Sequence, residues 1–169
     1  MTIELHTCHV KYFVCKIYSM NAKNIQSGES SPLDLDRQIC HSLYSAANAL
    51  VRAYRPLLTK LDLTYPQYVV MMSLWQRDGV SISELVQHTR FDAGTLTPLL
   101  RRLQKKGLID IKVADTDERR KVITVTTQGR NLKKSAESVP KQIACSVDMP
   151  AQDALKLKEL CEELFSRLA

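Results

Sequence analysis

The chain has 169 residues, of which 44% are hydrophobic, and its formal net charge is +6. This length suffices for one compact domain and is marginal for two. The Lys and Arg residues are concentrated between Arg90 and Lys134. A positive field localised in this way indicates a polyanionic partner, most often a nucleic acid.

The five cysteines are widely spaced, odd in number and form no Cys-x-x-Cys pair; they are Cys8, Cys15, Cys40, Cys145 and Cys161. This pattern argues against an extracellular disulfide framework and predicts a reducing, cytoplasmic setting. His6, Cys8, His9 and Cys15 match no standard structural zinc spacing. We therefore expect neither a metal nor another cofactor.

The first 33 residues are hard to connect to the rest of the chain. Lys11 and Lys16 interrupt the apolar residues of segment 1–18, and no small-residue cleavage site follows, so a signal peptide or a membrane association is not expected. Residues 21–34 have the composition of a linker. We expect residues 1–33 to be a disordered extension, and we hypothesise that the biological start is Met20.

Two helices are predicted next. Apolar residues recur at steps of three and four over residues 35–61, which is typical of a long amphipathic helix. Thr64-Tyr65-Pro66-Gln67 then has the pattern of a capping box, with Pro66 tolerated in the first turn. A second helix is therefore expected over residues 65–76.

A helix-turn-helix is predicted over residues 81–106. Ser81-Ile82-Ser83-Glu84 is another capping box and opens a short helix, which ends at a turn over residues 88–91. Asp92 can cap a further helix that runs through Lys106 and is closed by Gly107. Two short helices joined by a brief turn are the signature of this motif.

A β-hairpin follows the second of these helices. Residues 108–113 and 121–126 have the composition of strands, and residues 114–120 form a polar tip between them. A helix-turn-helix followed by a basic hairpin predicts a winged helix. The expected fold class is mainly α with a small β-hairpin wing.

The last third of the chain is expected to be helical. Leu132, Ala136, Val139 and Ile143 mark one amphipathic segment, while leucines from Leu155 to Leu168 mark another. We expect both segments to pack against the first helix and against a second subunit.

The helix expected over residues 92–106 has two different faces. Its leucines share one stripe, whereas the opposite face is small near the start and cationic near the end, as in a helix that enters the major groove. An ordinary solvated basic face is the alternative that the charges alone would allow. The residues of this second face are Gly94, Thr97, Pro98, Arg101, Arg102 and Lys105.

At the wing tip, Asp117-Glu118-Arg119-Arg120-Lys121 places three cations after two acids. An arginine there could enter a narrow minor groove, where the negative potential is strongest. A solvated turn is the alternative. We favour DNA contact because the hairpin follows a recognition helix.

From about Leu35 to Ala169 the chain resembles the MarR family of winged-helix regulators, with Asp117-Glu118-Arg119, the run from Val122 to Thr126 and Gly129 similar to the wing signature of that family. Three further motifs resemble the organic hydroperoxide resistance regulators, OhrR. They are Gln38-Ile39-Cys40 with Tyr44, Leu63-Thr64-Tyr65-Pro66-Gln67-Tyr68, and Gly94-Thr95-Leu96-Thr97-Pro98-Leu99-Leu100.

The resemblance implies a homodimeric repressor that binds double-stranded DNA at an inverted-repeat operator and releases it when an organic hydroperoxide oxidises Cys40. It also implies that Tyr54 and Tyr65 form hydrogen bonds to that cysteine, with Tyr44 nearby. Arg119 would be the arginine of the minor groove. Cys145 would form a disulfide between subunits, of the two-cysteine type.

The resemblance also implies a domain organisation for the expected elements. Residues 34–169 would form one winged-helix domain, with the helix-turn-helix at 81–106, the wing at 108–126 and dimerisation helices over 128–168. Thr95 would join the small and cationic residues that contact DNA.

The local setting of Cys40 is equivocal. Only a thiolate reacts with peroxide; Arg37, three residues earlier on the expected helix, favours it, while Asp36, four earlier, opposes it. The helix dipole is weak by the second turn. Tyr44 lies one turn beyond Cys40, although core packing is an equal alternative for its ring.

Tyr54 cannot reach the Cys40 of its own straight helix, because 14 residues at 1.5 Å each separate them by ~21 Å. If Tyr54 belongs to the site, it must come from the other subunit. Cys145 could resolve a sulfenic acid at Cys40, and a small thiol is the alternative resolver. Cys161, beside Leu160 and Leu164, is expected in the core.

Two other functions remain open. The chain could be a winged-helix regulator that a reversible small ligand, such as a phenol, induces, with cysteines that are only structural. It could instead be a thiol peroxidase, but no reductant motif or catalytic partner set supports that. We therefore expect a regulator and not an enzyme.

Overall fold

The computed structural model describes residues 31, 33–114 and 117–169, and the side chains of 114 and 117–120 lie outside this description. The described chain divides after Leu50 into two units, which we describe in turn. The expected extension over residues 1–33, including Met20, Cys8 and Cys15, lies almost entirely outside the described residues.

The first unit contains a 3-10 turn over Leu35–Arg37 and the start of α2 (Ile39–Thr59). The single helix expected over residues 35–61 is therefore wrong at its start. Gln38 has an extended backbone, with φ −87° and ψ 111°, so the helical hydrogen bonds of α2 cannot continue back through it. The first helical carbonyl is that of Gln38, which accepts from the Ser42 amide.

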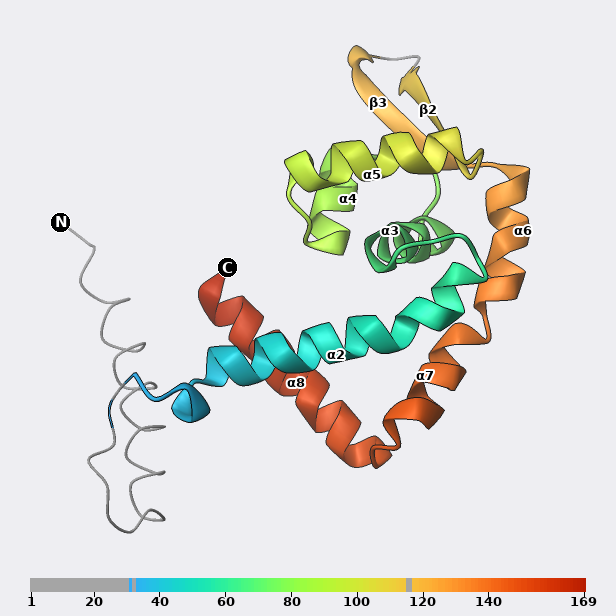
Figure 1. Cartoon of the computed structure of the whole chain (residues 1–169). Coiled ribbons are helices and arrows are strands. Elements are labelled where there is room, and N and C mark those ends of the chain that lie inside the picture. The colour runs from blue at the N-terminus through green and yellow to red at the C-terminus, as the bar shows by residue number, and fades with distance from the viewer. Residues whose placement is uncertain (1–30, 32, 115–116) are drawn as a thin grey trace, which may run out of the picture. The chain divides into compact units, whose positions relative to one another are not determined.

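The second unit begins within α2 and continues through the helix-turn-helix. Its elements are α3 (Tyr65–Gln76), β1 (Val80–Ser81), α4 (Ile82–Thr89) and α5 (Ala93–Lys105) (Figure 1). The sequence-based bounds of α3 are confirmed, as are the capping boxes of Thr64 with Gln67 and of Ser81 with Glu84. Asp92 caps α5 as expected, and Gly107 follows that helix with a φ of +68°.

The wing is a hairpin of β2 (Ile109–Ala114) and β3 (Asp117–Val125). The order of the antiparallel sheet is β1-β3-β2, with Ile123 of β3 paired to Val80 on one side and to Ile111 on the other. The strands reach closer to the tip than expected, since both extend into residues 114–120. The short strand β1 was not predicted, because only its pairing with β3 defines it.

Three helices complete the chain: α6 (Thr127–Ala136), α7 (Val139–Val147) and α8 (Ala151–Leu168). The amphipathic segment expected around Leu132 to Ile143 is two helices instead of one. Pro140 lies in the first turn of α7, where its ring would clash with the carbonyl four residues earlier in a continuous helix. The second expected segment is α8.

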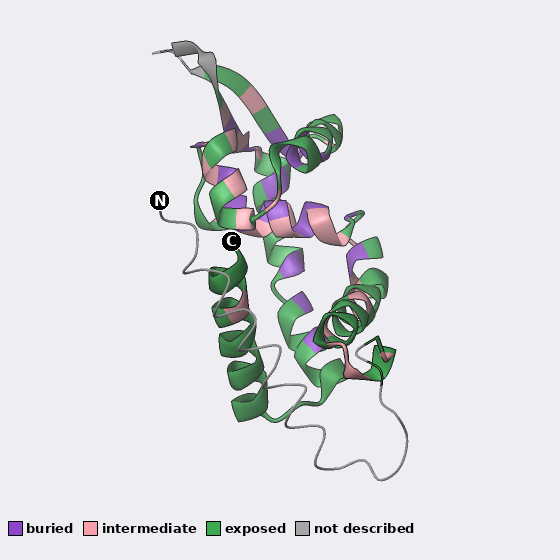
Figure 2. Ribbon diagram, turned by 90° about the vertical axis from the view of Figure 1, so that its left-hand side faces the viewer, coloured by how far each residue is buried: buried purple, intermediate pink, exposed green. Residues whose placement is uncertain are grey.

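The core of the second unit lies between α3, α4, α5 and the sheet. Buried residues on one face of α5 meet Leu85 of α4, Met71 and Leu74 of α3, and Ile109 and Ile123 of the hairpin. By contrast, within this described part α8 has no buried residue, and α2 buries only Leu58 (Figure 2). The fold class is confirmed as mainly helical with a small antiparallel sheet.

Where the hairpin meets α6, Gly129 packs against backbone. A Cβ at this position would lie 2.2 Å from the Leu108 carbonyl oxygen and 2.8 Å from Cγ1 of Val125. Both are below any real contact distance, and a carbonyl oxygen in a strand junction cannot swing away as a side chain can. Only glycine fits here without moving the hairpin.

We therefore expect Gly129→Ala to lower the free energy of unfolding by about 1–3 kcal/mol through overpacking. Urea denaturation followed by circular dichroism measures the loss. Ser135→Ala, at an exposed position on the same helix, is the control and should change stability by less than about 0.5 kcal/mol. Equal stability of the two variants would contradict the close packing of Gly129.

Candidate functional site

The expected reading face of α5 is fully exposed. Leu96, Leu99, Leu100 and Leu103 are buried on the opposite face, as the periodicity predicts. The six candidate residues that the structure brings together on the exposed side of this helix are Gly94, Thr95, Thr97, Pro98, Arg101 and Arg102. Small side chains near the start and long cations near the end give this face the shape of a helix that inserts into a groove.

Hydrogen bonds fix the first turn of α5. The Asp92 carboxylate accepts from the Thr95 amide and from the Thr95 hydroxyl, each at 2.7 Å. The hydrogen bond from the hydroxyl is the main reason that the pKa of Asp92 lies below its usual value, so this carboxylate stays charged. One turn later the Thr97 hydroxyl donates to the Ala93 carbonyl at 2.9 Å.

The turn before α5 is tied to the C-terminal helix. Arg90 has a left-handed backbone, with φ 60° and ψ 20°, and caps the end of α4. Its guanidinium forms an ion pair with Glu162 of α8 at 2.5 Å and lies 4.0 Å from the ring centroid of Phe165. The hydrogen bond from Arg90 is the main cause that lowers the pKa of Glu162.

The base of the wing is tied to the end of α3. Asp78 accepts from the Val125 amide at 2.8 Å, and its other carboxylate oxygen lies 3.6 Å from the guanidinium of Arg130. Arg130 in turn donates to the Val125 carbonyl at 2.6 Å. These contacts hold the root of β3. Arg119 lies on β3, and its side chain is outside the described residues.

Cys40 is exposed and is the second residue of α2. The expectation that it lies in the second turn of a longer helix, with Asp36 and Arg37 on the same helix, is wrong, because the helix begins at Ile39. In this first turn the backbone amides lack helical partners, and the partial positive charge of the helix end favours an anion.

The three candidate tyrosines do not form one group in the described chain. Tyr44 lies one turn after Cys40 and is 71% exposed, so among the described residues it does not pack in the core. Tyr54 and Tyr65 are neighbours, with ring centroids 5.0 Å apart, and Tyr68 lies 6.1 Å from Tyr54. Burial, then the neighbouring Tyr65, raises the pKa of both Tyr54 and Tyr68, so both remain hydroxyl donors at neutral pH.

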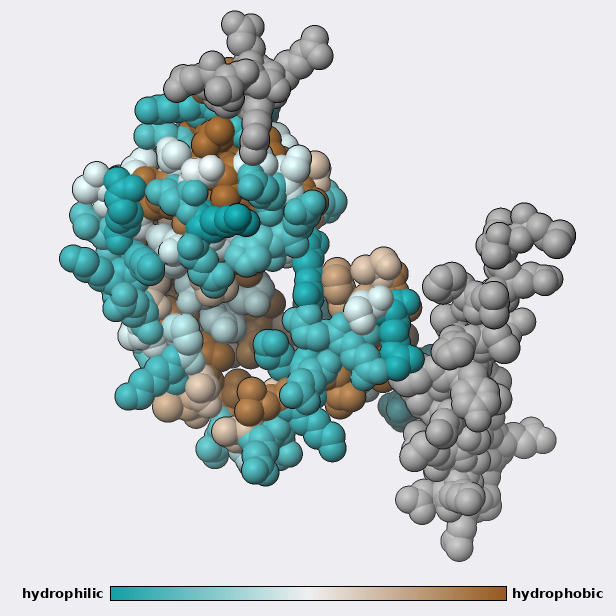
Figure 3. All heavy atoms as spheres, turned by 180° about the vertical axis from the view of Figure 1, so that it is seen from behind, coloured by the Kyte–Doolittle hydropathy of each residue, from teal (hydrophilic) through white to brown (hydrophobic). Residues whose placement is uncertain are grey.

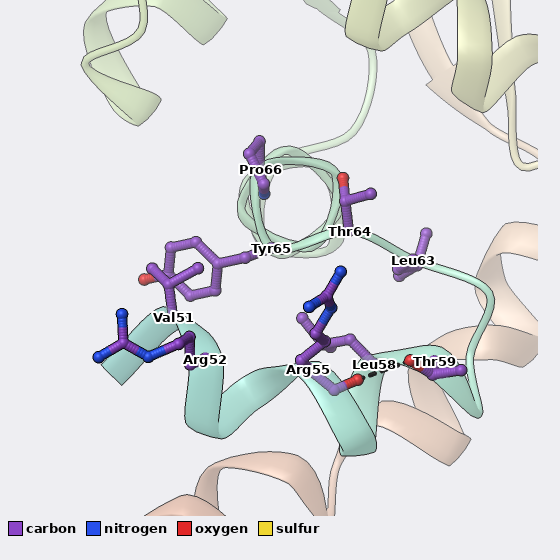
Figure 4. Close-up of a pocket in the computed structure, with 9 residues that line it drawn as sticks. All are labelled: Val51, Arg52, Arg55, Leu58, Thr59, Leu63, Thr64, Tyr65 and Pro66. Atoms are coloured by element: carbon purple, nitrogen blue, oxygen red, sulfur yellow. Dashed lines mark hydrogen bonds between the residues drawn. The ribbon is translucent and has the colours of Figure 1, made fainter. Parts of the chain in front are cut away.

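A pocket of about 400 Å³ lies beside this tyrosine pair, between α2 and the start of α3 (Figure 4). In this view Arg55 points from α2 toward the start of α3, whereas Arg52 points outward. Val51, Leu58 and Leu63 supply apolar lining. The sequence reading missed both arginines, although Arg52 and Arg55 flank Tyr54 on one helix and could have been found by that spacing.

The other two described cysteines are also exposed. Cys145 lies near the end of α7, and Cys161 lies on α8. The expectation that Cys161 belongs to the core is wrong for the single chain, since α8 packs too loosely to bury any residue. Its leucine neighbours Leu160 and Leu157 are exposed as well.

Two other kinds of feature are absent from the described part of the chain. No group of three or more His, Cys, Asp or Glu residues there is arranged to hold a metal ion. His6, Cys8, His9 and Cys15 fall outside the described residues. Among the described helices, none has the length and apolar character needed to cross a membrane.

Residues 52–136 match the family model of the transcriptional regulator SarA/Rot. The chain is 42% identical over 146 residues to the HTH-type transcriptional regulator TtmR of Methylorubrum extorquens, covering 84% of this chain and 75% of that protein. It is 35% identical over 136 residues to the organic hydroperoxide resistance transcriptional regulator of Bacillus subtilis, covering 80% of this chain and 90% of the relative.

Solved structures agree with these relatives. Overoxidized AbfR bound to DNA is 28% identical, with a TM-score of 0.64 over 80% of this chain and 95% of its own. A mutant of Escherichia coli MarR complexed with operator DNA shares the fold, with a TM-score of 0.72 at 21% identity over 80% of this chain and 99% of its own. The chain therefore belongs to the MarR/SarA family of winged-helix transcriptional regulators.

Proposed function

We propose that this regulator is a dimeric, DNA-binding repressor that releases its operator when an organic hydroperoxide oxidises Cys40. The observation that carries the proposal is the place of Cys40, which is exposed in the first turn of α2, so that a peroxide has access to its sulfur. The relative from Bacillus subtilis, named for organic hydroperoxide resistance, supports the choice of oxidant.

The apolar faces that a single chain leaves uncovered support the dimer. Leu35, Ile39 and Leu50 are exposed in the N-terminal unit, and α8 exposes further leucines together with Phe165. Hydrophobic atoms accordingly reach the surface between hydrophilic ones (Figure 3). A second copy would remove these side chains from water, as is usual where amphipathic terminal helices lack partners in their own chain.

The oxidation has two balanced steps. The Cys40 thiolate attacks one oxygen of the hydroperoxide, the O–O bond breaks, and the alkoxide takes up a proton and leaves as an alcohol. The resulting sulfenic acid then condenses with the Cys145 thiol of the second subunit, forming a disulfide and releasing water. No reductant is needed until the disulfide is returned to two thiols.

Tyr54 and Tyr65 would complete the sensor from the second subunit. Their rings lie together beside the pocket, and the raised pKa of Tyr54 keeps its hydroxyl protonated. A protonated phenol donates to a thiolate and stabilises it. Tyr44, one turn after Cys40, is exposed, so a second subunit could cover its ring.

On DNA, the exposed face of α5 would lie in the major groove and Arg119 would reach the minor groove. A change in the dimer could reach α5 through Arg90, because this residue contacts Glu162 and Phe165 of α8 and immediately precedes the recognition helix. The distance between the α5 helices of the two subunits would then no longer match the spacing of the operator half-sites.

Cys40→Ser should abolish release from DNA by cumene hydroperoxide, because no thiolate remains at the sensing position. Fluorescence anisotropy with an operator duplex measures release, and non-reducing gel electrophoresis measures the disulfide. After peroxide treatment, the non-reducing gel should show a disulfide-linked dimer for the Cys161→Ser variant but not for the Cys145→Ser variant. If the Cys40→Ser variant leaves DNA at the same peroxide concentration as the wild-type protein, the proposal is contradicted.

Arg119→Ala should weaken operator binding and reduce the slope of log K against log salt by about one ion, since one phosphate-neutralising charge is lost. The measurement is a salt titration of the binding constant. Lys60→Ala, at an exposed position at the end of α2, is the matched loss of charge and should leave the slope unchanged. Identical slopes for wild type and Arg119→Ala would remove the wing from DNA binding.

Arg90→Ala should weaken operator binding about three- to tenfold, because the turn before α5 loses its contact with α8. It should cost less than about 1 kcal/mol of stability, since the ion pair is exposed. Arg167→Ala is the control, because its ion pair with Glu163 lies within α8 alone. Equal binding by Arg90→Ala and Arg167→Ala would show that the contact does not position α5.

The pocket at Arg55 favours a second candidate function, induction by a reversible ligand. The guanidinium of Arg55, the Tyr65 ring and the apolar lining suit an anionic aromatic molecule. Salicylate, as the probe, should then release DNA equally from wild type and Cys40→Ser, and Arg55→Ala should abolish its effect. Release by peroxide that requires Cys40 would instead favour the thiol sensor.

A further inference from the structure

We propose that the first two turns of α5, with the cap residue Asp92, recognise A·T base pairs through hydrogen-bond acceptors and methyl groups, because the side chains from Asp92 to Pro98 have no free donor for a base. This inference rests on the proposed role of α5 in DNA binding and names the bases that it would take. The reason is that the hydroxyl groups of Thr95 and Thr97 already donate hydrogen bonds within the protein.

The Thr95 hydroxyl donates its hydrogen bond to the Asp92 carboxylate. A charged carboxylate can only accept, so the 2.7 Å contact between the Thr95 hydroxyl and the carboxylate requires the hydroxyl to donate. Such a charge-assisted hydrogen bond is among the stronger ones. The lowered pKa of Asp92 is consistent with this arrangement. Thr95 is exposed, and toward a base it offers oxygen lone pairs and a methyl group.

The Thr97 hydroxyl is engaged in the same way. Its partner at 2.9 Å is the Ala93 carbonyl, which also can only accept. Thr97 therefore presents an acceptor and a methyl group as well. The other exposed residues of these two turns supply no side-chain donor, since Gly94 has no side chain and Pro98 adds only an apolar ring.

This chemistry matches one kind of base pair. In the major groove adenine presents an amino donor and thymine presents a methyl group. An A·T pair therefore offers a donor to a threonine oxygen and an apolar contact to a threonine methyl group. Guanine presents two acceptors, which would find no proton on these two turns. Cytosine has an amino donor, but it is paired with guanine and has no methyl group. Guanine contacts should therefore come from Arg101 and Arg102, farther along the helix.

The first test is selection from a randomised DNA duplex with the reduced wild-type chain and with Thr95→Val and Thr97→Val. Valine keeps the shape and a methyl group but removes the acceptor. Positions at which a variant loses its base preference are the positions that these two turns read, and we expect A·T pairs there. Loss of preference at a guanine would overturn the inference. Failure of the wild-type chain to enrich any sequence would instead overturn the proposed function.

Base analogues then test the individual groups on the selected duplex. Purine in place of adenine removes the amino donor, and uracil in place of thymine removes the methyl group; each should weaken binding about three- to tenfold. Replacing adenine by 7-deazaadenine removes only an acceptor, so binding should stay within about twofold. A large effect of 7-deazaadenine would show that these two turns donate a proton after all.

Asp92→Ser tests the cause of the acceptor-only face. Serine can still cap the helix, but its shorter side chain lacks the second oxygen that binds the Thr95 hydroxyl. The freed hydroxyl could donate to guanine, so this variant should accept a G·C pair at the position that Thr95 reads. Unchanged discrimination against guanine, with unchanged helical circular dichroism, would overturn the role of Asp92.

Discussion

The close approach of α6 to the root of the hairpin is the constraint on which the DNA-binding part depends. Gly129 lets its helix lie against the Leu108 carbonyl, and its own carbonyl accepts from the indole of Trp75 at 2.9 Å. Asp78 adds a hydrogen bond to β3 from the other side. The root of the hairpin, the end of α3 and the start of α6 therefore form one junction, which fixes the position of the wing relative to these helices.

The N-terminal unit and α8 have the opposite character. In the part that the structure describes, they carry apolar stripes but bury almost nothing, so their stability depends on what covers them. The proposed sensor lies in this poorly buried region, whereas the reading face lies on the well-packed junction. A covalent change at Cys40 would thus act where packing is weakest. The DNA-binding part, with α5 and the wing, would then move on the DNA without changing its own shape.

The sequence predicted the elements whose signals are local. Capping boxes at Thr64 and Ser81 and the cap at Asp92 depend on residues three positions apart, and all three lie where expected. The start of α2 was missed because apolar periodicity continues through Gln38 although its backbone is extended. The strand β1 depends on a partner some 40 residues away in sequence, which periodicity cannot supply.

For the candidate site, composition and spacing identified the exposed face of α5, because one leucine stripe fixes which side is buried. They could not reveal that Tyr54 and Tyr65 are neighbours, since this depends on how α3 returns along α2. Nor could they place Arg55 at a pocket, or show that the hydroxyls of Thr95 and Thr97 are already engaged. Cys161 was assigned to the core because leucines recur around it, although it is exposed among the residues that the structure describes.

The left-handed turn at Arg90 has a consequence for how such a regulator could be engineered. Glycine adopts this conformation freely, whereas any other residue pays about 1 kcal/mol there. A library screened only for heat resistance would therefore favour glycine at this position. The resulting protein would be more stable and would keep every residue that we propose to contact DNA, but the turn before α5 would have lost the arginine that contacts α8.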